Sequence, residues 1–141
     1  MKVLKIVLIV LAAIILFVGV FLGVLTITEF MPKDVQQADV LNNRSFDTVE
    51  LGREYTALSF NTGYAGLGKE SDFFMDGGKS VRTTRELTEK NLEGIKGFLS
   101  SESPDFVLLQ EVDRDSKRTY GIDETQQITD LLGKSSSFAL N

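Results

Sequence analysis

An unbroken apolar run near the N-terminus limits what this chain can fold into more than any other feature. Residues 6–25, IVLIVLAAIILFVGVFLGVL, include no charged and no strongly polar side chain. A helix of about twenty such residues, rising about 1.5 Å per residue, spans a hydrocarbon core of roughly 30 Å. We therefore expect residues 1–28 to form a transmembrane anchor.

A cleaved secretory signal is the alternative reading of this run. The apolar part of such a signal is usually about 7–15 residues long and ends at a small-x-small cleavage site. The run here is longer, and it continues into TITEFMPKD, which has no such site. Lys2 and Lys5 precede the run and Glu29 follows it, so the positive-inside rule predicts a single-pass protein of the cell membrane with its N-terminus in the cytoplasm. The rest of the chain would then be extracytoplasmic.

The composition beyond the anchor limits the chemistry. Lys2, Lys5 and Glu29 fall within residues 1–30, so the 15 basic and 20 acidic residues of the whole chain become 13 and 19 in the remainder, a net charge of −6. Proteins held on nucleic acid by charge alone are usually basic, but a metal-dependent enzyme acting on phosphates remains compatible with this charge. The chain has no cysteine and no histidine. Disulfides, thiolate metal sites and a histidine general base are therefore excluded within it.

Residues 29–53 have the composition of a tether followed by a polar lead-in, a segment that connects the tether to the domain. Residues 54–141 have the composition of an α/β layered domain. YTALSFN (55–61) alternates and is rich in β-formers, which predicts a strand. DFVLLQEV (105–112) is a nearly continuous apolar run, typical of a strand covered on both faces. The glycine-rich residues 62–82 predict a long loop, and long loops in compact domains are often functional.

A helix is predicted between these two strands. Thr83 followed by Glu86 forms a capping-box pattern ahead of apolar residues at helical spacing. Gly94 and Gly97 weaken the helix, but we expect them to permit close packing on a sheet. Ser103, followed by proline, marks its end.

A second helix and a further strand are predicted after residue 122. Asp123 is positioned to cap the helix, and Gly133 is positioned to end it. SSSFALN (135–141) is expected to begin another strand. In the lead-in, Asn43-Arg44-Ser45 fits a glycosylation acceptor, a pattern that is common by chance.

The stretch from Gly63 to Lys69 matches the phosphate-binding pattern G-x-x-x-x-G-K. A nucleotide-binding loop of this kind needs Ser or Thr after the lysine and a helix that starts there. Position 70 is Glu, and Gly77 and Gly78 fall where the helix should be in its second turn. We therefore expect a glycine-rich surface loop here.

The segment DRDSKRTYGIDE resembles a calcium-binding loop in part. Asp113, Asp115 and Glu124 occupy its first, third and twelfth positions. Lys117 and Arg118 stand where an oxygen ligand and a turn-forming glycine belong, and a cation at a ligand position repels the metal. The segment is therefore not expected to bind calcium.

Polar residues close the two predicted strands of the domain. Asn61 ends ALSFN, and Gln110 and Glu111 end FVLLQE. Ligands of α/β sheets bind in the crevice at the carboxyl ends of the strands, and Mg²⁺ takes one or two carboxylates while keeping several waters. These residues are thus candidates for a metal or phosphate site. The alternative is that Asn61 merely starts a turn and Glu111 is solvated at a strand edge.

These strand ends carry a family resemblance. ALSFNTGYAG, followed about fifty residues later by PDFVLLQEVD, resembles the endonuclease/exonuclease/phosphatase superfamily, the metal-dependent phosphodiesterases related to DNase I, exonuclease III and the neutral sphingomyelinases. Asn61 matches the first motif of that family, and Gln110 and Glu111 match the second. MDGGKSVR (75–82) and NLEGIKGFL (91–99) also resemble membrane-anchored bacterial members.

The resemblance covers residues 55–141 and implies a hydrolase with a four-layer α/β sandwich. It implies that Mg²⁺ or Mn²⁺, held by Glu111 with Asn61 nearby, assists attack of water on a phosphoester. It places Asn61 and Glu111 in the catalytic site and suggests Arg118 and Tyr120 as further catalytic residues, a solvated loop being the alternative for these two. The implied substrate is a phosphodiester: a phospholipid, another small phosphodiester or nucleic acid. The sequence indicates no protein partner.

The chain departs from the family in lacking the residues that the second half of the domain supplies. Family members take a general-base histidine, its aspartate partner and a G-D-x-N motif from that half, and this chain has no histidine at all. We therefore expect residues 54–141 to be the N-terminal half of the sandwich, inactive alone, with a core face exposed to water. The alternative is a non-catalytic, membrane-anchored interaction domain.

Overall fold

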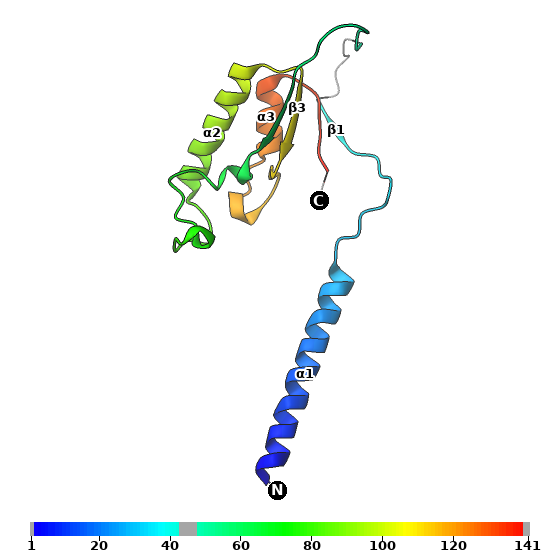
Figure 1. Cartoon of the computed structure of the whole chain (residues 1–141), viewed down its shortest axis with the longest axis vertical. Coiled ribbons are helices and arrows are strands. Elements are labelled where there is room, and N and C mark those ends of the chain that lie inside the picture. Colours follow the sequence, from blue (N-terminus) through cyan, green and yellow to red (C-terminus); the bar gives the residue numbers. More distant parts are fainter. Residues whose placement is uncertain (1, 43–47, 140–141) are drawn as a thin grey trace. The chain divides into compact units, whose positions relative to one another are not determined.

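The structure, a computed structural model, describes residues 2–42 and 48–139 of the chain (Figure 1). The chain divides into two compact units, Met1–Gln37 and Ala38–Asn141. The boundary falls within the stretch that the sequence assigns to the tether. The glycosylation pattern at residues 43–45 lies outside the described residues.

The first unit contains one long helix, α1 (Lys2–Thr28), in which no residue is buried. Most of its side chains are Leu, Ile, Val, Ala and Phe, so it presents apolar surface on every side. The Thr26 and Thr28 hydroxyls donate to the carbonyls of Leu22 and Val24, so both hydroxyls are satisfied within the helix. By length and composition the helix could cross a membrane, and a signal sequence would have the same properties.

The second unit is built on two parallel strands, β2 (Ala57–Asn61) and β3 (Phe106–Gln110). Their register pairs Ala57 with Phe106 at one end and Asn61 with Gln110 at the other. Parallel neighbours need a crossover connection, which α2 (Arg85–Glu102) supplies. Between β2 and α2, residues 62–84 form the predicted long loop, with two short 3₁₀ turns, η1 (Gly63–Ala65) and η2 (Phe74–Asp76).

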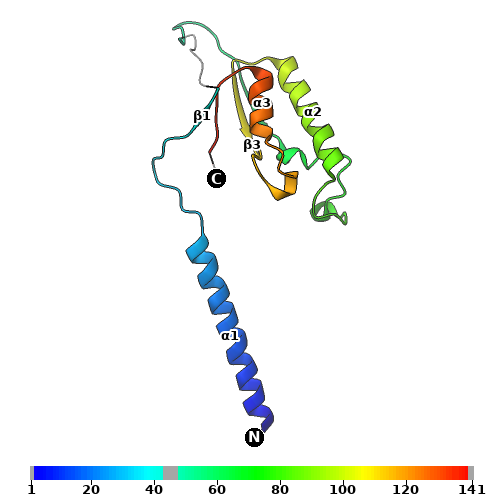
Figure 2. The same cartoon turned by 180° about the vertical axis from the view of Figure 1, so that it is seen from behind.

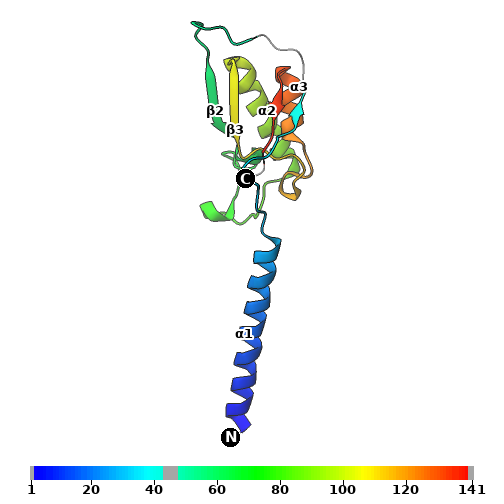
Figure 3. The same cartoon turned by 90° about the vertical axis from the view of Figure 1, so that its right-hand side faces the viewer.

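Two helices cover one face of this strand pair. α2 and α3 (Glu124–Leu132) lie side by side in Figures 1 and 2, and Figure 3 shows both on the same side of β2 and β3. The core between them comprises the buried residues Ala65, Leu92, Leu99, Ile122 and Ile128, with Leu58, Ile95, Val107, Leu109 and Leu132 packed against these. Each strand contributes alternate residues to this core, as the pleat requires.

The prediction that the second strand is covered on both faces is wrong for the described part of the chain. Exposure alternates along both strands, and the outward-facing Phe106 and Leu108 remain 48% and 54% exposed. An apolar face of the strand pair is therefore exposed to water there. A continuous apolar run cannot by itself show what covers its second face, because the covering element lies elsewhere in the chain.

The predicted helix ends are correct except for one cap. The side chain of Asp123 accepts a hydrogen bond from the Gln126 N–H, and Gly133 ends α3 in the left-handed conformation. The cap of α2 is Thr84, which accepts from the Leu87 N–H, rather than Thr83. Thr83 is buried instead, so the capping-box pattern was assigned one residue too early.

The glycines of α2 do not serve the packing that the sequence suggested. A methyl group added at Gly94 or Gly97 would meet no atom within 4 Å. Both therefore lie on an open side of the helix.

The strand expected after residue 134 is confirmed as a short strand, β4 (Ser136–Ser137), which pairs antiparallel with β1 (Val40–Leu41). Part of the predicted lead-in thus belongs to the second unit, and the architecture of this unit is α/β.

Candidate functional site

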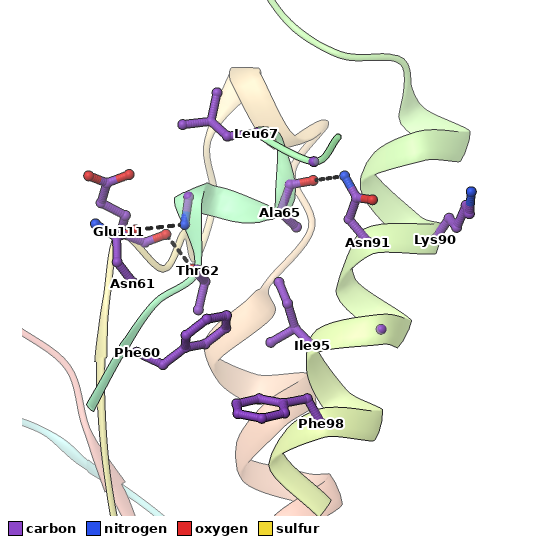
Figure 4. Close-up of a pocket in the computed structure, with 13 residues that line it drawn as sticks. Phe60, Asn61, Thr62, Ala65, Leu67, Lys90, Asn91, Ile95, Phe98 and Glu111 are labelled. Carbon is purple, nitrogen blue, oxygen red and sulfur yellow. Dashed lines mark hydrogen bonds between the residues drawn. The ribbon is translucent and has the colours of Figure 1, made fainter. Parts of the chain in front are cut away.

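The carboxyl ends of β2 and β3 border a pocket of about 720 Å³ between the η1 turn and α2 (Figure 4). Asn61 and Glu111 lie at one side of it, and Lys90 and Asn91 of α2 lie at the other. The floor is apolar and includes Phe60 and Phe98, whose ring centroids are 5.4 Å apart, together with Ile95. Gly94 also lines the pocket, and its missing side chain leaves the wall open. The pocket therefore joins a polar edge to an apolar floor.

Asn61 is the last residue of β2, and its side chain is exposed. The side-chain oxygen accepts a hydrogen bond from the Gly63 N–H at 2.8 Å, which starts the η1 turn. Asn61 therefore starts a turn, which is what the alternative to a ligand-binding role predicted. An amide oxygen has two lone pairs, so this contact leaves acceptor capacity and both N–H donors for a ligand.

Glu111 follows the last residue of β3 and adopts a left-handed backbone conformation, with φ 54°. A non-glycine residue in this region costs about 1–3 kcal/mol and persists only where its surroundings enforce it. Its carbonyl accepts hydrogen bonds from the Tyr64 N–H and the Thr62 hydroxyl, each at 2.7 Å. The turn after β2 thereby fixes the backbone of Glu111, whose carboxylate is exposed beside Asn61 (Figure 4).

The η1 turn itself contains two further non-glycine residues with positive φ, Tyr64 at 44° and Ala65 at 48°. The Ala65 carbonyl accepts a hydrogen bond from the Asn91 side chain, which ties the turn to α2. Half of the six such residues in the described part of the chain thus gather at this one end of the sheet. Backbone strain of this kind clusters at functional sites. The sequence did not predict this strain, because nothing local marks Tyr64 as left-handed.

Arg118 reaches this end of the sheet through Tyr64. Its guanidinium donates two hydrogen bonds of 2.8 Å to the carboxylate of Asp113 and lies 3.8 Å from the centre of the Tyr64 ring. Burial acts to raise the pKa of Asp113. The hydrogen bonds and the charge of Arg118, with hydrogen bonds from Thr119 and Ser116, outweigh burial and hold that pKa below its ordinary value. The same hydrogen bonds to Asp113 raise the pKa of Arg118. Arg118 is therefore a rigid cation beside the turn that supports Glu111.

Tyr120, the fourth residue suggested by the sequence, lies apart from this pocket. It is absent from the pocket lining within the described chain, and its hydroxyl donates to the Thr83 carbonyl at 2.7 Å. Its ring instead lies under the guanidinium of Arg82, at 4.3 Å. The structure thus places Asn61 and Glu111 in the pocket lining and Arg118 outside the lining, against the turn that holds Glu111. Tyr120 lies in another region.

Glu124 is a buried carboxyl that the sequence named only as the twelfth position of the rejected calcium loop. It is 1% exposed, and one of its oxygens accepts from the Asp113 N–H at 3.1 Å. The other oxygen has no hydrogen-bond partner among the described residues. Burial raises the pKa of Glu124 to about 7. An acidic residue in the first turn of a helix is ordinarily exposed, so only the tertiary structure reveals this one.

The polar edge of the pocket fits a weakly held divalent ion better than a closed metal site. In residues 2–42 and 48–139, no group of three or more acidic, His or Cys side chains is placed to hold a metal. Glu111 offers one carboxylate and Asn61 one amide oxygen, and Mg²⁺ accepts such a sparse set because it keeps several waters.

No α-helix begins between Lys69 and Arg85, so the helix that a nucleotide-binding loop needs is absent there.

Comparison of the chain with models of protein families, with characterised proteins and with solved structures found no match.

Proposed function

We propose that this chain carries the metal-binding part of a membrane-anchored phosphodiester hydrolase of the endonuclease/exonuclease/phosphatase type. Residues 54–141 would form one half of a four-layer α/β sandwich, and α1 would be an uncleaved anchor whose N-terminus is cytoplasmic. One observation supports the proposal most directly. Asn61 and Glu111 come from the adjoining ends of two parallel strands, and the turn after the first strand holds Glu111 in a strained backbone conformation.

Mg²⁺ or Mn²⁺ is the cofactor that this pair would hold, through the Glu111 carboxylate and the Asn61 amide oxygen. When bound, such an ion neutralises the charge that develops on a phosphate during hydrolysis. The N–H donors of Asn61 would orient a phosphate oxygen, and Arg118 would position the Glu111 turn through Tyr64. The chain contains no histidine, so we assign no general base within it.

Direct ion binding by the full-length chain in neutral detergent micelles tests this proposal. Electron paramagnetic resonance would follow Mn²⁺ binding with and without bis(p-nitrophenyl) phosphate, an uncomplicated diester. We expect one saturable ion that binds more tightly with the diester present, because the ion and a phosphate bound together strengthen each other's affinity. Glu111→Ala should remove this ion.

Glu102→Ala is the matched control, because it removes an exposed carboxylate at the far end of α2. It should leave Mn²⁺ binding unchanged. Equal Mn²⁺ affinity in the wild type and Glu111→Ala would reject the site.

The outward face of β2 and β3 favours a second candidate function, a non-catalytic interaction domain. Phe106 and Leu108 lie exposed there, and apolar side chains grouped on a surface commonly mark an interaction site. A chain that binds no Mn²⁺ under any of these conditions would favour this candidate over the hydrolase.

A further inference from the structure

A second depression, of about 490 Å³, lies where the loop before α2 meets the loop after β3. Its lining shares no residue with the pocket beside Asn61 and Glu111. Arg82, Arg85 and Lys117 contribute three cationic side chains to it, against one carboxylate from Asp115. The whole chain has a net charge of −5, so this concentration of positive charge runs against the composition. We call this depression, which is lined by Arg82, Arg85, Asp115, Ser116, Lys117, Tyr120 and Gly121, the basic depression.

Contacts between the two loops hold the guanidinium of Arg82 in place. One of its nitrogens donates to the Lys117 carbonyl at 2.6 Å, and the group lies 4.3 Å from the centre of the Tyr120 ring. The Tyr120 hydroxyl is in turn held by the Thr83 carbonyl at 2.7 Å. Arg82 is thus held by a carbonyl and an aromatic ring. It forms no ion pair with a carboxylate in the described part of the chain, so its positive charge remains available to a ligand.

The other two cations are also available to a ligand. The Lys117 amine makes no hydrogen bond or ion pair with any residue that the structure describes. Arg85 pairs with Glu89 at 2.9 Å, but both side chains are more than half exposed, and a pair of this kind contributes little. Arg85 is also the first residue of the 18-residue α2, whose N-terminal end carries partial positive charge.

We infer that the basic depression binds a phosphate group, whether this belongs to a lipid headgroup or to a free phosphate. Arginine and lysine side chains arriving from two loops suit an anion with several oxygens in different directions, and a guanidinium can bind two of them at once. The Ser116 hydroxyl, which also lines the depression, could donate a further hydrogen bond. This inference needs neither a metal ion nor hydrolysis, so it goes beyond the proposed function and does not rest on it.

Nuclear magnetic resonance of the full-length chain in neutral detergent micelles tests the first source, with inorganic phosphate as the probe at constant ionic strength. We expect saturable shifts of the backbone amides of residues 82–85 and 115–121. Lys117→Gln keeps the carbonyl that holds Arg82 and should weaken phosphate binding about tenfold, as expected for loss of a hydrogen bond to a charged group. Lys69→Gln removes the same charge from the glycine-rich loop and should bind phosphate like the wild type.

Hydrogen exchange tests the second source, with the full chain in nanodiscs of phosphatidylcholine alone or mixed with phosphatidylglycerol. Slower exchange over the same amides with phosphatidylglycerol, lost in Lys117→Gln but kept in Lys69→Gln, would identify a lipid headgroup. Phosphate binding without this protection would identify a soluble phosphate.

The inference is overturned if neither probe affects these amides, or if Lys69→Gln weakens binding as much as Lys117→Gln. Glu111→Ala should leave phosphate binding at the basic depression unchanged. Failure of the metal site and failure of this site are therefore separable.

Discussion

The buried carboxyl of Glu124 should make the stability of the second unit fall as the pH rises from 5 to 8. Burial raises its pKa from 4.5 to about 7, and the negative charges of Asp113 and Asp123 act in the same direction. The Asp113 N–H and the Arg118 charge oppose the shift without cancelling it. The folded state therefore binds this proton more tightly than the unfolded state does.

The sign and size of the effect follow from that difference. Because the pKa is higher in the folded chain, the stabilisation is complete below about pH 4.5 and is lost as the pH rises through about 7. At about 1.4 kcal/mol per pKa unit, the free energy of unfolding should fall by about 3 kcal/mol across this range. The carboxyls whose pKa values are lowered, Glu70, Glu86, Asp105 and Asp113, affect stability only at lower pH.

Urea unfolding of the full chain in neutral detergent, followed by near-ultraviolet circular dichroism between pH 5 and 8, would measure this loss. Glu124→Gln keeps an oxygen to accept from the Asp113 N–H but cannot ionise, so its unfolding free energy should be nearly independent of pH. Glu102→Gln, at an exposed position, should keep the wild-type slope. A flat wild-type curve, or the same slope in Glu124→Gln, would show that Glu124 does not carry a raised pKa.

Three further pairs of substitutions test the packing and the helix ends by the same unfolding measurement. Leu99→Ala should cost about 2–5 kcal/mol because Leu99 is fully buried, whereas Leu131→Ala, at a 47% exposed position, should cost clearly less; equal costs would contradict the core assignment. Gly97→Ala should stabilise α2 by up to about 1 kcal/mol because the added methyl group meets open space, while Gly133→Ala should destabilise because φ there is 61°; effects of the same sign would contradict the backbone assignment. Thr84→Ala should lower the free energy of unfolding by about 1 kcal/mol because α2 loses its cap, and Thr84→Ser should keep the wild-type stability. Unchanged stability in Thr84→Ala would show that Thr84 does not cap α2.

The α/β arrangement of the second unit was largely predictable because its signals are local. Both strands, the helix between them and the capped helix from Asp123 to Gly133 follow from periodicity and end residues within short windows. The error of one residue at Thr84 arises because two adjacent threonines offer the same hydroxyl to the helix. Only packing decides which of them is buried.

Two residues that border the pocket, Asn61 and Glu111, were named from the sequence, but their geometry was not predictable. Strand-end position made Asn61 and Glu111 candidates, and the family resemblance placed them in a site. The left-handed conformation of Glu111 depends on a hydrogen bond from Thr62, 49 residues earlier in the chain, and sequence reasoning has no local signal for such a contact. Tyr64 donates to the Glu111 carbonyl and its ring packs against the Arg118 guanidinium. Its supporting role was not predicted, for the same reason.

The sequence by itself determined the apolar N-terminal helix, because twenty adjacent apolar side chains identify such a helix without any contact to the rest of the chain. It also determined which polar residues stand at the ends of the two strands. The tertiary structure alone decided that Glu124 is buried, that one face of the strands stays open and that Arg82 and Lys117 meet. Each of these depends on segments far apart in the chain, and burial and charge at such a point are set by what folds against it rather than by neighbouring residues.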